Sequence, residues 1–148
     1  MRRGSRVRGL GDEGSAAVEA AIVLPGVLML LCMAIAGGRL VTSHAKIDAA
    51  AEDAAREASI HRTAASAQAA ARAAASDSLN DQGLACSSVS VNVNTGGLNV
   101  PVGQVGTVRV AVQCTVPLSD LLLPGLPGAR TLTSSATSVV DQYRQRGA

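Results

Sequence analysis

Residues 13–40 read EGSAAVEAAIVLPGVLMLLCMAIAGGRL, and this stretch decides the fold of the chain. From Ala20 to Gly38 it contains nineteen residues without a charge, close to the roughly 20 that a helix needs to cross the hydrocarbon core of a bilayer. Pro25 and Gly26 would weaken such a helix in water, but both are tolerated in membrane helices. The alternative is a buried core helix, but nothing later in the sequence is apolar enough to cover one. The sequence therefore predicts a transmembrane helix over residues 15–38.

The segment before this helix, residues 1–14, is a short basic leader that carries Arg2, Arg3, Arg6 and Arg8. Positive residues next to a membrane helix favour the cytoplasmic side. We therefore expect a single-pass protein of the cytoplasmic membrane, with its N-terminus in the cytoplasm and its C-terminal domain outside.

The segment after the apolar run, residues 39–79, is rich in Ala and charged residues and contains no Gly or Pro from Leu40 to Asp77. Acid and base recur at helical spacing, for example Glu52 with Arg56, a pattern that supports a helix. We expect an extracytoplasmic continuation of the same helix. It is either a solvated stalk or a stripe that packs on the distal domain or on a sister subunit.

The distal segment, residues 84–148, changes to a twofold period that is typical of half-buried strands. Three strands are predicted, and the third is weaker and rich in Ser and Thr. Their inward positions are Val89, Val91 and Val93; Val108, Val110, Val112, Cys114 and Val116; and Leu132, Ala136 and Val140. The predicted fold is therefore α+β, a long N-terminal membrane helix followed by a small antiparallel sheet of about three to four strands.

The loop between the last two predicted strands reads PLSDLLLPGLPGAR over residues 117–130 and contains three prolines. Its leucines either fold back onto the sheet or form an exposed contact for a partner.

The three cysteines differ in their expected surroundings. Cys32 lies in the membrane run, whereas Cys86 and Cys114 flank the first two strands in a compartment that should be oxidising. A disulfide between Cys86 and Cys114 would close a loop of about 29 residues and contribute roughly 3.6 kcal/mol. The alternative is two free thiols packed as small hydrophobic groups. Because no His or further Cys lies nearby, no metal site is expected.

The composition argues against several classes of function. The formal net charge is only +2 and the bases beyond the leader are scattered, so there is no footprint for nucleic acid. No Ser/His/Asp arrangement, phosphate-binding Gly loop or paired carboxylates can be identified. We therefore expect no enzyme activity, no cofactor and no small-molecule substrate. With an aromatic content of 1%, the core must be built from Val, Leu and Ala, and a staple or an assembly partner is expected.

The junction before the membrane run holds one unusual residue, Glu19, which follows Gly14 by five positions. A carboxylate near a bilayer is costly and is a functional hypothesis by default. The spacing of Gly14 and Glu19 ahead of an apolar helix resembles the processing site of type IV pilins. The fuller string EGSAAVEAAIVLP, with GGRL after the run, resembles the TadE-type pseudopilins of the tight-adherence (Tad/Flp) pilus system.

This resemblance implies a role for each of the matching residues. A prepilin peptidase would cut after Gly14 and leave Ser15 as the new N-terminus, and Glu19 would face the freed amine on a neighbouring subunit. The protein would be a minor pilin or pseudopilin that supports pilus assembly or export, surface attachment and adhesion. Its partners would be the peptidase, the assembly platform with its ATPase, and other pilin-like subunits.

Two other interpretations remain open. Ala34, Ile35 and Ala36 fit a signal-peptide cleavage site, and cleavage after Ala36 would release a secreted soluble domain that begins at Gly37. Alternatively, the chain is an anchored scaffold or adhesive domain that is never processed at Gly14.

Overall fold

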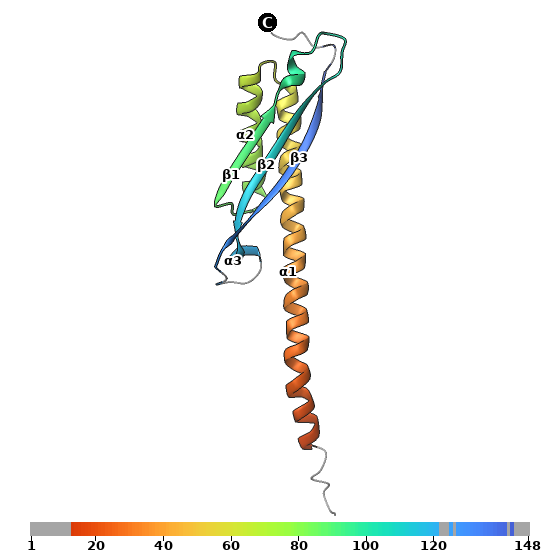
Figure 1. The fold of residues 1–148 in the computed structure, drawn as a ribbon, viewed down its shortest axis with the longest axis vertical. Coiled ribbons are helices and arrows are strands. Elements are labelled where there is room, and N and C mark those ends of the chain that lie inside the picture. The colour runs from red at the N-terminus through yellow and green to blue at the C-terminus, as the bar shows by residue number, and fades with distance from the viewer. Residues whose placement is uncertain (1–12, 122–124, 126, 142, 144–148) are drawn as a thin grey trace, which may run out of the picture. The chain divides into compact units, whose positions relative to one another are not determined.

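The computed structural model describes residues 13–121, 125, 127–141 and 143, and the chain divides into two compact units, residues 1–35 and 36–148. The elements follow the order α1 (Glu13–Ile60), α2 (Ala64–Asp81), β1 (Ser88–Asn94), the 3-10 helix η1 (Gly96–Asn99), β2 (Gly106–Pro117), α3 (Leu118–Leu121) and β3 (Ala129–Val140) (Figure 1). A long N-terminal apolar helix precedes a three-stranded antiparallel sheet, so the predicted α+β fold is confirmed.

The described part of the first unit is the N-terminal portion of α1. It is helical through Pro25, where the missing N–H and the proline ring would ordinarily disturb a helix. Large apolar side chains are exposed all along it. Their accessibility ranges from 48% at Val27 to 78% at Met29. Within its unit, this segment therefore has no apolar cover of its own.

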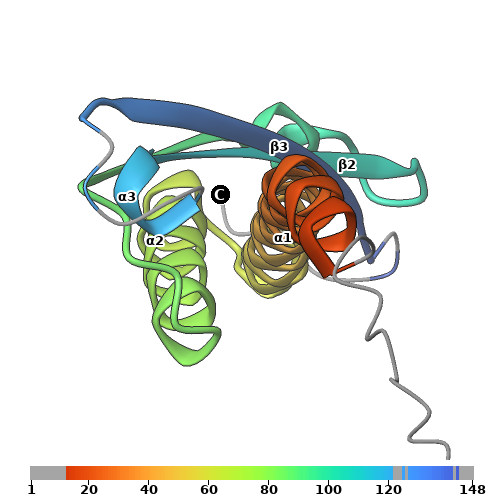
Figure 2. The ribbon, with the colours of Figure 1, turned by 90° about the horizontal axis from the view of Figure 1, so that it is seen from below.

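The second unit has two layers, a sheet and a pair of helices. The strand order is β1-β2-β3 and both pairings are antiparallel; Val91 lies opposite Val112, and Val110 lies opposite Ala136. Figure 2 shows α2 and the second half of α1 side by side beneath one face of this sheet. Neither α1 nor α2 lies on the other face in that view.

Burial along the second and third strands follows the predicted twofold period. In β1 Val91 and Val93 are half-buried, whereas Val89, predicted to point inward, is 46% exposed. In β2 every second residue, from Gly106 to Val116, is buried. In β3 the inward positions are less apolar, and only Leu132 and Val140 are fully buried. The predicted strands and the weaker third strand are confirmed, and they form one sheet with one face covered.

The helical side of the core is built mostly from Ala. Its buried members are Ile47, Ala50, Ala51, Ala54, Ala55 and Ala58 from α1, and Ala67, Ala71, Ala75 and Leu79 from α2. Because Ala adds little bulk, a helix lined by it can approach its neighbour closely. The Ala-rich stripe thus packs on the distal sheet of its own chain, and the solvated-stalk alternative is wrong for this part of α1.

The predicted uninterrupted helix over residues 39–79 is wrong in one respect. The helix α1 ends at Ile60, and α2 starts at Ala64. Thr63 has an extended backbone (φ −115, ψ 150), and its Oγ1 accepts a hydrogen bond from the Ser66 N–H at 3.2 Å. This is the geometry of an N-cap, which satisfies a helix-terminal donor and starts a new helix. The break lets α2 return alongside α1.

Polar contacts hold the two helices together at their open end. The Lys46 Nζ donates to the Gln82 carbonyl at 2.7 Å, and the Ser78 hydroxyl donates to the Asp53 Oδ2 at 2.8 Å. The ion pair suggested by the spacing of Glu52 and Arg56 does not form. Among the described residues, the His61 Nε2 lies 3.5 Å from the Glu57 Oε1, and this contact is an ion pair only when the imidazole is protonated.

The loop after β2 folds back in part onto the core. Leu121 in α3 is 1% exposed and Leu118 packs against the same cluster. The predicted contact of the other leucines cannot be placed, because Leu122, Leu123 and Leu126 lie outside the described residues. A disulfide joins Cys86 to Cys114, whose Cα atoms are 5.5 Å apart. It ties the segment before β1 to the central strand.

Candidate functional site

The residues named by the pilin-like motif lie within the first two turns of α1. The helix begins at Glu13, so Gly14, Ser15 and Glu19 all have helical backbone. At a rise of about 1.5 Å per residue, the backbone positions of Ser15 and Glu19 are about 6 Å apart along the axis.

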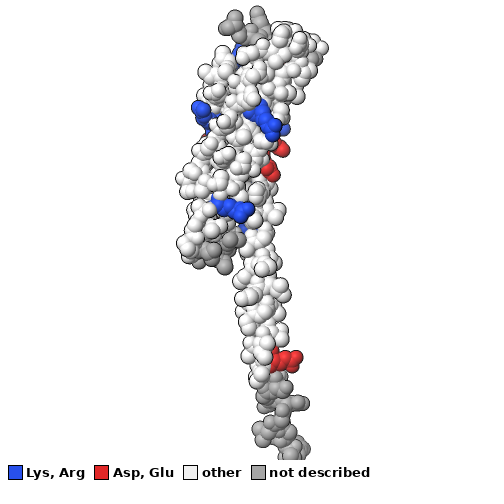
Figure 3. Space-filling model, in the orientation of Figure 1, with Lys and Arg blue, Asp and Glu red and all other residues white. Residues whose placement is uncertain are grey.

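Glu19 has no charged neighbour in the apolar part of the helix. It is the only Asp, Glu, Lys or Arg between Ala16 and Gly38, and its side chain is exposed. Together with Ala16, Ala20 and Val23 it lines a shallow hollow of about 290 Å³ on the helix surface. In Figure 3 the N-terminal part of this helix is white except for acidic red near its lower end. The structure therefore presents one anionic group at the head of an apolar surface.

The apolar surface that follows Glu19 has the dimensions of a membrane span. By length and composition, one helix among the described residues can cross a bilayer; its most apolar window has a mean hydropathy of 2.4, and none of it is buried within the structure. A helix that is apolar on all sides needs lipid or other apolar helices around it. Its solitary carboxylate needs a positive partner or a place among the head groups.

The end of the apolar run is marked by two hydroxyl contacts. The Thr42 Oγ1 donates to the Gly38 carbonyl at 2.8 Å, and the Ser43 Oγ donates to the Arg39 carbonyl at 2.9 Å. These bonds satisfy both hydroxyls within the helix itself, a common arrangement for Ser and Thr in helices. Ser43 is 8% exposed, so the buried stripe of α1 starts only a few residues beyond the apolar run.

The other candidate residues form no reactive constellation in the described part of the chain. Cys32 is a free, exposed cysteine, and Cys86 and Cys114 are joined to each other. No group of three or more His, Cys, Asp or Glu side chains is placed to hold a metal ion there.

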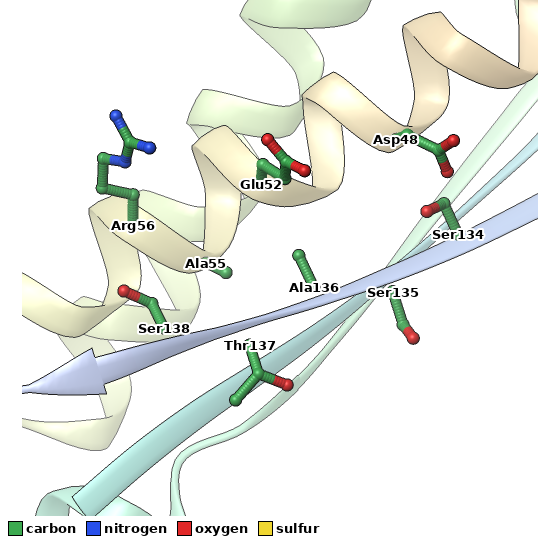
Figure 4. A pocket seen from close by; sticks show the side chains of 9 residues that line it. All are labelled: Asp48, Glu52, Ala55, Arg56, Ser134, Ser135, Ala136, Thr137 and Ser138. Carbon is green, nitrogen blue, oxygen red and sulfur yellow. The ribbon is translucent and has the colours of Figure 1, made fainter.

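One feature was missed by sequence reasoning, an open groove of about 450 Å³ in the second unit. It is lined by Asp48, Glu52, Ala55 and Arg56 of α1 and by residues 134–138 of β3 (Figure 4). The two walls are about 80 residues apart in the sequence, and no local pattern links them. Only the pairing of the sheet with α1 brings them together.

Comparison with known proteins finds a similarity in the N-terminal segment. Residues 14–56 match the model of a family described as TadE-like protein. No curated protein and no solved structure matches the chain. The match begins at Gly14, includes Ser15 and Glu19, and continues through the apolar run into the buried stripe of α1.

Proposed function

Because residues 14–56 of this chain are TadE-like, we propose that the protein is a minor pilin or pseudopilin subunit that supports the assembly or export of a Tad/Flp-type pilus, with a role in surface attachment. The observation that carries the proposal is Glu19, a single carboxylate at the head of an exposed apolar helix and five positions after Gly14. A protein of the TadE-like family is typically structural, so the proposed role is non-catalytic.

The first step in this function is proteolytic processing. A prepilin peptidase cuts the peptide bond between Gly14 and Ser15 on the cytoplasmic side and leaves the whole apolar helix in place. The positive charges of the basic leader keep the N-terminus in the cytoplasm and so orient the chain in the membrane for the peptidase.

The second step is charge pairing during assembly. The freed amine of Ser15 is cationic, and the Glu19 carboxylate of a neighbouring subunit is anionic. Two opposite charges attract far more strongly in a medium of low dielectric than in water, and their pairing removes much of the cost of holding either one there. The apolar helices then pack together as a bundle as the subunits leave the bilayer. The assembly platform and other pilin-like subunits are the partners.

The two alternatives, a secreted domain and an unprocessed anchor, differ in what they require of α1. A signal-peptide cut after Ala36 would remove most of the segment that matches the family and would separate the apolar run from the helix that continues beyond it. An unprocessed anchor is compatible with the fold but leaves the solitary Glu19 without a role. Both considerations favour the pilin-like proposal.

The experiment that separates these possibilities is the N-terminal sequence and intact mass of the protein purified from its native membrane. We expect the mature chain to begin at Ser15. A mature N-terminus at Gly37 would indicate a secreted domain, and an intact leader would indicate a simple anchor; either outcome would contradict the proposal.

The role of Glu19 is tested by substitution in the same native system. In Glu19→Ala we expect cleavage to persist and pilus assembly to fail, because the amine of the neighbouring subunit loses its partner. Glu19→Asp keeps the charge and should retain part of the assembly, whereas Gly14→Ala should retain the leader. Normal piliation in Glu19→Ala would rule out the charge pairing.

A further inference from the structure

The outer edge of β3 is a long, unpaired strand edge. β3 has twelve residues and is the last strand in the order β1-β2-β3, so it pairs with β2 on one side only. Next to this ladder, the Leu118 N–H donates to the Gly128 carbonyl at 2.9 Å. In an antiparallel pair the hydrogen-bonded positions alternate. Even-numbered residues of β3 therefore bond to β2, and odd-numbered residues point their N–H and C=O groups to the free edge.

These outward N–H and C=O groups have no hydrogen-bond partner among the residues that the structure describes. They belong to Thr131, Thr133, Ser135, Thr137 and Val139. Natural sheets protect such edges with Pro, Lys, inward charges or very short strands. Between Ala129 and Val140 there is no Pro and no Lys, and Arg130 is the only charged residue. The edge is thus open to pairing with another strand.

The groove beside this edge has room for the side chains of an added strand. Figure 4 shows Ser134, Ala136 and Ser138 on the side of β3 that faces α1, and Ser135 and Thr137 on the other side. The inward side chains are small and leave the space of about 450 Å³ unfilled. A strand paired to the β3 edge would direct every second side chain into this space, toward α1.

The wall that those side chains would meet is predominantly acidic. Asp48 and Glu52 line the groove together with Arg56, and the single ion pair within the described residues involves none of the three. Both carboxylates are exposed. An incoming strand with basic side chains at the inward positions would pair with them.

We propose that the free edge of β3 receives an extended strand from a second protein, with basic side chains at the alternate positions that enter the α1–β3 groove. Backbone hydrogen bonds would supply affinity, and the groove would select the side chains, as in other strand-addition complexes. A second copy of β3 fits less well, because Arg130 is the only basic residue among its even-numbered, inward positions. The proposal does not depend on cleavage at Gly14.

The test uses the full chain in neutral detergent micelles and two synthetic eight-residue probes, one of alternating Thr and Lys and one of alternating Thr and Glu. We expect the Lys peptide to bind and the Glu peptide to bind at least about tenfold more weakly. Amide exchange measured by NMR should slow at Thr133, Ser135 and Thr137 when the Lys peptide binds. Amides at even positions are already bonded to β2 and should change little.

Two variants separate edge pairing from charge attraction alone. Thr137→Pro removes one outward N–H and leaves the hydrogen bonds between β2 and β3 intact, a change that a strand edge tolerates. It should weaken binding of the Lys peptide by about tenfold or more. The control variant Thr137→Val should bind the peptide like the parent. Asp48→Asn combined with Glu52→Gln should abolish the preference for Lys over Glu without changing the fold.

Several results would overturn the proposal. Equal binding of the Lys peptide to the parent and to Thr137→Pro would exclude strand pairing at the β3 edge. An unchanged preference for the Lys peptide over the Glu peptide in the variant with Asp48→Asn and Glu52→Gln would show that these two carboxylates do not select the peptide. If Thr137→Pro does not fold, the amide-exchange pattern and the doubly neutral variant still decide. Concentration-dependent self-association through the same amides, without peptide, would make a second copy the occupant.

Discussion

Loss of the bond between Cys86 and Cys114 should lower the stability of the second unit markedly. The two cysteines are separated by 28 positions. The chain-entropy relation gives about 3.6 kcal/mol for closing a loop of that size. For a unit that spans residues 36–148, about 1 kcal/mol corresponds to about 4 °C in melting temperature. The cleanest change is Cys86→Ala, because Cys86 is only partly buried, and we expect a fall of about 15 °C.

The assay is differential scanning calorimetry of the full chain in micelles under oxidising conditions. In the variant, Cys114 stays as a buried thiol at 0% exposure, which behaves as a small hydrophobic group and adds little cost of its own. Cys32→Ala is the matched control, since Cys32 is free and exposed, and its melting temperature should match the parent. A fall of less than about 5 °C in Cys86→Ala would refute the view that this staple supplies a large share of the stability.

Three smaller predictions concern the packing of the same unit. Thr63→Ala should cost about 1 kcal/mol, measured by urea unfolding, because α2 loses its N-cap hydroxyl; Thr63→Ser should cost much less. Gly97→Ala should destabilise by about 1–3 kcal/mol, since a Cβ there would collide with the Thr107 backbone, whereas at Gly96 it would meet only the end of a side chain; equal melting temperatures for the two would argue against this close approach. Ile47→Ala should cost about 2–5 kcal/mol by leaving a cavity in the core, and near-parental stability would show that the helices relax into the space.

The sequence was informative wherever one period extended over many residues. The apolar run identified the first helix, and the alternating Val residues from Val108 to Val116 identified the central strand, because burial of one face imposes these periods directly. The same logic located β3 despite its many hydroxyls, since Leu132, Ala136 and Val140 still share one parity. In each case the local pattern and the final packing agree.

The features that were not predicted depend on single residues or on distant pairing. The turn at residues 61–63 rests on one Thr63 cap in an Ala-rich background, where helix propensity is high on both sides. The order of the strands follows from which strands pair, and the groove beside Ser134 and Ser138 follows from how the sheet lies on α1. No sequence pattern links Asp48 and Glu52 to a groove, because the opposite wall is formed by a segment that comes much later in the chain.

The change of surroundings along α1 explains why the chain needs assembly or lipid. From Ile47 to Ala58 the buried side chains of α1 are covered by its own sheet and by α2, whereas from Val18 to Ile35 every large apolar side chain is exposed. No charge other than Glu19 interrupts the exposed portion. Such a surface is unfavourable in water, since each large apolar side chain left exposed forgoes about 1.5–3 kcal/mol of burial free energy. The requirement for an external apolar environment therefore follows from burial alone, and the charge on Glu19 limits which environments satisfy it, because that carboxylate needs either the interface or a cationic neighbour.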